Sequence, residues 1–145
     1  MGDVRVFGNH APHQTWMEQA GLRIFTGEED APNVLICTYD NLSEDPLERL
    51  SGTIAPVRDA MTYVQQNDVQ RVVLLSDGAG YAGPRKVANA PKSATFNDVH
   101  GMGSLTSEVL ANIAISEGVE VLIVRGDPLT EASTRRTVID ALRKN

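Results

Sequence analysis

The chain has 145 residues, of which 41% are hydrophobic and 22% are charged, and its formal net charge is −6. This is the size of one ordinary globular domain, and the composition excludes disordered, collagen-like and disulfide-stapled proteins. A lone Cys37 excludes an internal disulfide and a cysteine-based zinc site. The acidic charge argues against binding to a phosphate backbone, so we expect no nucleic-acid partner.

The longest apolar runs fall far below the roughly 20 residues that cross a bilayer. The first residues show neither a basic region nor a cleavable apolar stretch. We therefore expect no contact with a membrane and a cytoplasmic location.

Five short apolar runs rich in β-branched residues predict strands. They are continuous and do not alternate with polar residues, which is typical of strands buried on both faces of a sheet. In chain order they span residues 4–7, 22–25, 34–37, 71–75 and 119–124.

Helical periodicity fills the intervals between these strands. Residues 46–66 carry apolar residues at spacings of three and four, with Ser43 or Asp45 as the cap, Pro46 in the first turn and Pro56 as a predicted kink. Further helices are predicted over 13–20, closed by Gly21, over 104–116, ending at Gly118, and over 132–143. The glycine- and proline-rich residues 77–103 predict a long loop.

The alternation of strands and helices predicts a mostly parallel, five-stranded sheet with helices on both faces. We expect one Rossmann-like three-layer α/β/α sandwich over residues 1–145. Its site should lie at the carboxyl ends of the strands.

The resemblance to a known family rests on four stretches, taken in their order along the chain. They are NVLI at 33–36, GTIAPVR at 52–58, RVVLLSD at 71–77 and GVEVLIV at 118–124. In this order and spacing the chain resembles the second half of a short-chain dehydrogenase/reductase. The stretches resemble that family's fourth strand, its central interface helix, the strand that ends in the catalytic serine, and the sixth strand. Because little sequence precedes residue 33, the resemblance implies a truncated member.

The family's chemistry needs a tyrosine acid, a lysine four residues later, a serine that polarises the carbonyl, and often an asparagine. The resemblance places Phe96 at the tyrosine, His100 at the lysine, Asp77 at the serine and Gly52 at the asparagine. All four positions are substituted, which implies a catalytically degenerate member.

The cofactor-binding half is also altered. Of the family's glycine-rich turn only Gly8 remains, while Pro12 and Gln14 stand where later glycines belong and add bulk against a diphosphate. We expect no cofactor, or weak binding of NAD(P) at most. The candidate cleft comprises Gly8, Asn9, Thr38, Tyr39 and Ser76.

The three histidines do not predict a metal site, because His10 and His13 lie far in sequence from His100. We interpret them as ordinary loop residues. An acid–base pair of Asp77 and His100 is the alternative.

The leading hypothesis is a catalytically inactive, structural or regulatory subunit. The resemblance implies association through helices 46–66 and 104–116, as a homodimer or with an active reductase subunit, with Arg58, Thr62 and Gln65 bordering the contact.

Two alternatives stay open. One is a small NAD(P)-dependent oxidoreductase or epimerase that uses Ser76 and Tyr81, although Lys86 follows Tyr81 by five residues where the family has four. The other is a flavodoxin-like module that binds a small ligand.

Overall fold

The computed structural model describes residues 2–38, 42–76 and 99–144. Within them the chain forms one five-stranded sheet in the order β2-β1-β3-β4-β5, in which every pair of neighbours is parallel. The Rossmann-like fold is thus confirmed, with a sheet that is wholly and not mostly parallel. The strands are β1 (Asp3–Gly8), β2 (Arg23–Phe25), β3 (Asn33–Cys37), β4 (Arg71–Ser76) and β5 (Glu120–Arg125).

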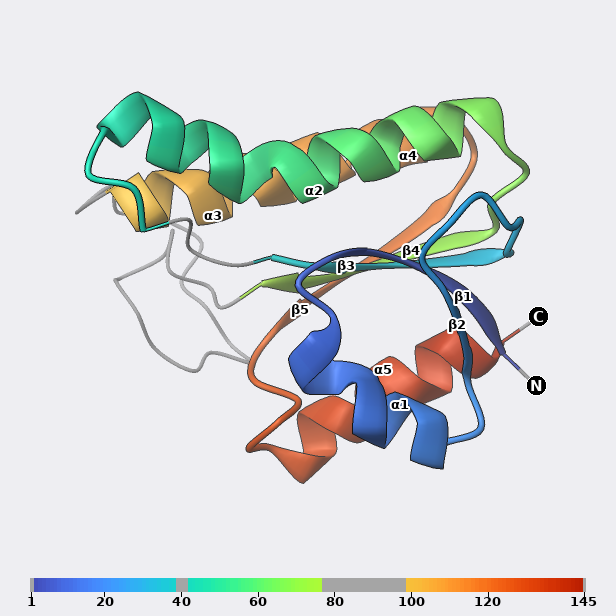
Figure 1. Ribbon diagram of the computed structural model, residues 1–145. Helices are drawn as coiled ribbons and strands as arrows, with labels where there is room; N and C mark the ends of the chain where they lie inside the picture. The colour runs from blue at the N-terminus through green and yellow to red at the C-terminus, as the bar shows by residue number, and fades with distance from the viewer. Residues whose placement is uncertain (1, 39–41, 77–98, 145) are drawn as a thin grey trace.

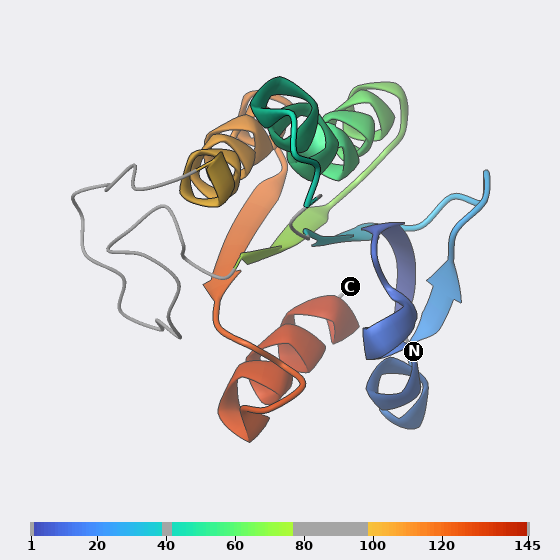
Figure 2. The same cartoon turned by 60° about the vertical axis from the view of Figure 1, so that its left-hand side comes forward.

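Helices cover both faces of the sheet (Figures 1 and 2). One face carries a 3-10 turn, η1 (Ala11–His13), the short α1 (Gln14–Gln19) and α5 (Ala132–Arg143). The other face carries α2 (Pro46–Gln66), α3 (Val99–Ala111) and α4 (Ile113–Ser116). No helix in the described part of the chain combines the length and apolar composition needed to cross a membrane.

Each face has its own hydrophobic core. Leu35 and Val73 face α1 and α5, where Met17 and Leu142 cover them. The opposite side chains of β3 and β4 pack under α2 and α4. Every residue of β3 and β4 is buried, as the continuous apolar runs predicted, whereas the edge strands β2 and β5 are largely half-exposed.

Helix α2 has the predicted bounds. Asp45 is the cap, because its side chain accepts a hydrogen bond from the Leu47 amide at 3.1 Å, and Pro46 follows in the first turn. The helix continues through Pro56, whose ring nitrogen has no proton to donate to the Gly52 carbonyl four residues earlier.

The predicted boundary between the 77–103 loop and the 104–116 helix is wrong, because α3 already begins at Val99. A Cβ added to Gly103 would lie 2.8 Å from Cγ2 of Thr53, so this glycine lets α3 approach α2 closely. The predicted helix is also divided at Asn112, whose amide donates to the Val109 carbonyl at 3.1 Å and whose carbonyl accepts from the Ile115 amide at 3.0 Å. These tight three-residue turns separate α3 from α4.

The predicted helix over 13–20 is found as α1, one residue shorter at each end. It starts late because Pro12 and its neighbours form the 3-10 turn. Gly21 and Gly118 follow their helices with φ of +79° and +78°, as expected of C-terminal glycines.

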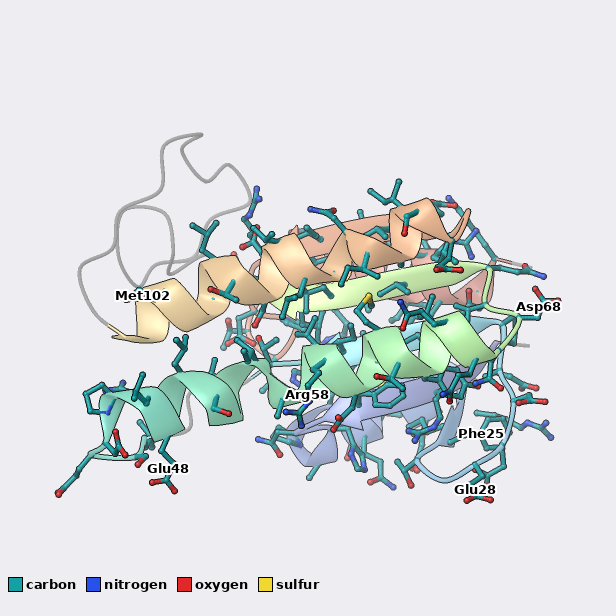
Figure 3. The ribbon with its side chains drawn as sticks, turned by 90° about the horizontal axis from the view of Figure 1, so that it is seen from above. Phe25, Glu28, Glu48, Arg58, Asp68 and Met102 are labelled. Atoms are coloured by element: carbon teal, nitrogen blue, oxygen red, sulfur yellow. The ribbon has the colours of Figure 1, made fainter. Side chains whose placement is uncertain are left out.

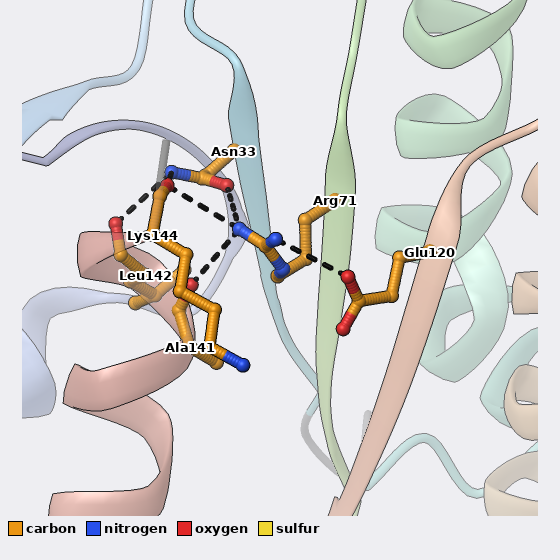
Figure 4. A network of polar contacts seen from close by, with 6 residues as sticks. All are labelled: Asn33, Arg71, Glu120, Ala141, Leu142 and Lys144. Atoms are coloured by element: carbon orange, nitrogen blue, oxygen red, sulfur yellow. Dashed lines mark hydrogen bonds and ion pairs between the residues drawn. The ribbon is translucent and has the colours of Figure 1, made fainter.

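A buried polar network ties the amino ends of the strands to the end of α5 (Figure 4). Nη1 of Arg71 donates to Oδ1 of Asn33 at 3.1 Å and to the carbonyls of Ala141 and Lys144 at 3.2 and 3.3 Å. Nη2 of Arg71 donates to Glu120 at 3.2 Å. One arginine thereby adds hydrogen bonds at the end of α5, where the Ala141 carbonyl also accepts from the Lys144 amide at 3.4 Å.

Candidate functional site

The carboxyl ends of the parallel strands meet at one edge of the sheet. There the chain leaves β1 toward α1 on one face and leaves β3 toward α2 on the other, although β1 and β3 are neighbours. Such a topological switch point is where open α/β sheets bind their ligands. The predicted cleft residues Gly8, Thr38 and Ser76 all lie along this edge.

Gly8 ends β1 in direct contact with β3. Its φ is +90°, and an added Cβ would lie 2.1 Å from the Cys37 carbonyl oxygen. The Asn9 amide donates to that same oxygen at 3.1 Å. Gly8 is therefore required by the packing of two backbones, whether or not a ligand binds beside it.

A groove of about 480 Å³ opens beside Gly8. Phe7 and Asn9 line it from the end of β1, and Pro56 and Asp59 line it from α2. Its volume is in the range of small-molecule sites. The Asp59 carboxylate, which pairs with Arg58 at 3.5 Å, also lines the groove and is not complementary to a phosphate.

The turn after β1 is filled by side chains. Nδ1 of His13 accepts a hydrogen bond from Nε1 of Trp16 at 3.2 Å, and the two rings meet edge to face. Burial lowers the pKa of His13 below its ordinary 6.5, against a weaker opposing effect of Asp127. The imidazole is therefore neutral near pH 7 and acts as an acceptor within the fold.

The two described residues at the end of β3, Cys37 and Thr38, are not poised as nucleophiles. Oγ1 of Thr38 donates to the Leu75 carbonyl at 2.8 Å, so this hydroxyl joins β3 to β4. Burial raises the pKa of the Cys37 thiol to about 12, which keeps it protonated. Tyr39, the other candidate on this turn, lies outside the described residues.

A buried polar cluster joins the ends of β4 and β5 to α3. Oγ of Ser76 donates to Oε2 of Glu108 at 2.8 Å and lies 3.2 Å from Oγ of Ser104. Nε and Nη2 of Arg125 donate to Oε1 of Glu108 at 2.9 and 2.6 Å. The Glu108 carboxylate is only 3% exposed, and both of its oxygens are occupied.

This cluster is suited to holding elements together more than to proton transfer. The Glu108 charge is balanced by Arg125, and the Ser76 hydroxyl is directed at a carboxylate. Ser76 was predicted as a cleft residue, whereas Ser104, Glu108 and Arg125 were missed. The available signal was a charged residue next to apolar residues, Glu108 before Val109 and Leu110 on α3 and Arg125 after Ile123 and Val124 at the end of β5.

The four substituted catalytic positions are only partly visible. Gly52 is half-buried within α2, and His100 lies in the first turn of α3. Asp77 and Phe96 lie outside the described residues, and so do Tyr81 and Lys86 of the oxidoreductase hypothesis. Among the residues that the structure does describe, no three His, Cys, Asp or Glu side chains gather in a way that could hold a metal ion.

No family model matches the chain, and neither does any curated protein sequence. Solved structures do match it. A short-chain dehydrogenase/reductase superfamily protein from Agrobacterium tumefaciens with bound NAD is 16% identical with a TM-score of 0.64, over 85% of this chain and 48% of that one. RMD from Pseudomonas aeruginosa complexed with NADPH is 15% identical with a TM-score of 0.65, over 86% of this chain and 53% of that one.

A UDP-galactose 4-epimerase structure is 16% identical with a TM-score of 0.62, over 86% of this chain and 55% of that one. The chain therefore has the fold of short-chain dehydrogenase/reductase superfamily proteins, in agreement with the resemblance seen in its sequence. It spans about half the length of the structures it matches.

Proposed function

We propose that this chain, built on the fold of NAD-binding dehydrogenases and epimerases, is a non-catalytic subunit that associates with a second copy of itself through α2 and α3–α4. The observation that carries the proposal is an apolar stripe on α3–α4. Met102, Val109 and Ile113 are 41%, 61% and 36% exposed, at successive spacings of seven and four residues. The seven-residue spacing of Met102 and Val109 within α3 is typical of a helix face that packs against another helix, and Ile113 follows at the start of α4.

The stripe lies beside a second exposed helix face. Figure 3 looks onto this side of the molecule, where α3–α4 run along α2 and Met102 and Arg58 are labelled. Arg58, Thr62 and Gln65 are exposed on α2, as expected for residues that border a contact. A stable dimer typically buries roughly 1,600 Å² in total, which two neighbouring helices per subunit can supply.

The polar groups at the strand ends support the non-catalytic part of the proposal. Glu108 is neutralised by Arg125, Thr38 is bonded to a backbone carbonyl, and the Cys37 thiol stays protonated. None of these groups is poised to exchange a proton with a substrate near neutral pH.

Light scattering coupled to size exclusion tests the association. We expect twice the 15.7 kDa of one chain for the unmodified protein. Val109→Glu should yield monomers, because each introduced charge would be desolvated in an apolar contact, and Thr62→Glu should do the same by facing its own copy.

Ile115→Glu is the matched control, since Ile115 is 58% exposed but lies on a different face of α4. A mass of 15.7 kDa at high micromolar concentration would contradict self-association and leave pairing with an active reductase subunit as the remaining form of the proposal. Equal effects of the Val109 and Ile115 substitutions would contradict the assignment to the stripe.

A second candidate is a small NAD(P)-dependent oxidoreductase or epimerase, favoured by the groove of about 480 Å³ beside Gly8. Trp16 is the sole tryptophan and follows the turn after β1, so its emission reports dinucleotide binding there. The non-catalytic proposal expects weak or no binding and no turnover of a carbonyl panel. A low-micromolar Kd together with turnover would establish the second candidate instead.

A further inference from the structure

A second groove, of about 540 Å³, lies on the opposite face of the sheet between α1 and α5. Its apolar lining comes from Trp16 and Ala20 on the α1 side and from Ile139 on α5. It is separate from the strand ends and from the apolar stripe. An inference from it therefore does not rest on the function proposed above.

Among the described residues, no carboxylate forms an ion pair with the three arginines of the groove. Arg135 donates to the carbonyls of Pro128 and Leu129 at 2.8 and 3.2 Å, and Arg143 donates to the Ala20 carbonyl. Arg136 is exposed, and within the described residues it forms no ion pair or side-chain hydrogen bond. These guanidinium charges remain uncompensated at the groove.

Several other arginines of the chain pair with carboxylates. Arg23 pairs with Asp3 at 3.0 Å, Arg71 with Glu120 at 3.2 Å and Arg125 with Glu108 at 2.6 Å. The chain carries 19 acidic residues against 13 lysines and arginines, so carboxylates are in excess. Only Asp140 contributes one to the groove. A cationic groove on an acidic protein is complementary to an anionic partner.

The lining favours a peptide over a nucleotide. The Trp16 side chain is 6% exposed and its Nε1 is bonded to His13, so it offers no open ring face on which a base could stack. Arg135 and Arg143 are held on separate backbone carbonyls and do not converge on one phosphate-sized point. Spaced positive charges beside an apolar floor match carboxylates spaced along a chain.

We propose that this groove docks a short acidic segment of a partner polypeptide, with its carboxylates on Arg136 and the neighbouring guanidinium groups and one apolar side chain on Ile139 and Ala20. The volume of about 540 Å³ is enough for a few side chains.

Selection of phage-displayed random dodecapeptides against the intact chain tests the proposal. Enriched peptides should combine several Asp or Glu residues with at least one large apolar residue. A synthetic peptide from that pool should change the emission of Trp16 saturably, because this sole tryptophan lines the groove.

Arg136→Glu should weaken binding of the peptide by about tenfold or more, since it reverses the charge that faces the peptide. Arg23→Glu makes the same change of net charge on an exposed arginine of β2, outside the groove and the proposed dimer contact, and should leave affinity within about twofold. Asp140→Asn removes the groove's carboxylate and should tighten binding.

Three results would overturn the proposal. The first is a selection with no acidic bias or no enrichment at all. The second is an equal loss of affinity with Arg136→Glu and Arg23→Glu. The third is displacement of the peptide by ATP at a lower concentration than by poly-glutamate. The last result would assign the groove to nucleotides.

Discussion

At the scale of single residues, the close approach of two backbones requires a glycine at position 8, at the end of β1. Gly8 and Gly21 both have φ near +90° or +80°, but only Gly8 has a backbone atom in the way of a Cβ. Comparing the two positions therefore separates the cost of a positive φ from the cost of a steric clash at the added Cβ.

We predict that Gly8→Ala lowers the free energy of unfolding by about 3 kcal/mol or more, because its Cβ would lie 2.1 Å from the Cys37 carbonyl oxygen. Gly21→Ala should cost only about 1–2 kcal/mol, since no atom lies within 4 Å of its added Cβ. Urea unfolding of both variants measures the difference. Equal decreases in the free energy of unfolding would show that β1 moves away from β3 to accommodate the Cβ.

His13 makes folding stability depend on pH. Burial lowers the pKa of His13 in the folded chain, so the unfolded chain takes up a proton first as the pH falls below about 6.5. We predict that the free energy of unfolding drops between pH 7.5 and pH 5.5, with loss of the Trp16 hydrogen bond. His13→Gln should flatten this drop in urea titrations at the two pH values, and an unchanged slope would contradict the assignment.

At the scale of secondary-structure elements, the contact between α2 and α3 depends on the absence of one side chain. Alanine favours a helix over glycine by about 1 kcal/mol, yet the Cβ of Gly103→Ala would lie 2.8 Å from Cγ2 of Thr53. Whether Gly103→Ala raises or lowers the free energy of unfolding therefore depends on its contact with Thr53.

We predict that Gly103→Ala destabilises the protein by about 1 kcal/mol in the natural background and stabilises it when combined with Thr53→Ala. The coupling in this double-mutant cycle should be about 1–2 kcal/mol. Chemical denaturation of the four proteins measures it. Additive effects would contradict the close packing of the two helices.

Gly103 also shows where prediction from sequence ends. Strands and the long helix α2 were predicted well, because their apolar spacing and the Asp45–Pro46 cap are local signals. The start of α3 was missed, because glycine is typical of loops in a sequence. The contact with Thr53 that favours glycine at position 103 is not visible in the sequence. At such positions the low helix propensity of glycine conflicts with the close packing of two helices, which requires it.

Only part of the candidate site, the residues at the strand ends, was predicted from the sequence. Gly8, Thr38 and Ser76 could be placed, because the carboxyl ends of parallel strands must share one edge of the sheet. The meeting of Glu108 with Ser76 and Arg125 depends on how α3 rotates over β4 and β5. No spacing along the sequence encodes that rotation.

At the scale of the whole molecule, the Arg71 network of Figure 4 fastens β3, β4 and β5 to α5. We predict that Arg71→Met lowers the free energy of unfolding by about 2–3 kcal/mol, because it leaves Oδ1 of the buried Asn33 without a donor and removes the bonds of Arg71 to Ala141 and Glu120. Arg23→Met, which removes only an exposed pair with Asp3, should cost less than about 1 kcal/mol. Thermal melts of the two variants compare them, and similar losses would contradict a special role for Arg71.

The same network has a consequence for synthesis on the ribosome. Arg71 precedes Lys144, one of its carbonyl partners, by 73 residues. At about 5–20 residues per second, roughly 4–15 s pass between the translation of the two. Throughout that interval the central strands exist without the last helix, with a guanidinium that must stay hydrated and an apolar sheet face uncovered. A ribosome-bound chain that lacks α5 should thus be a preferred client of chaperones, and one in which a linker after α5 lets this helix leave the ribosome should not.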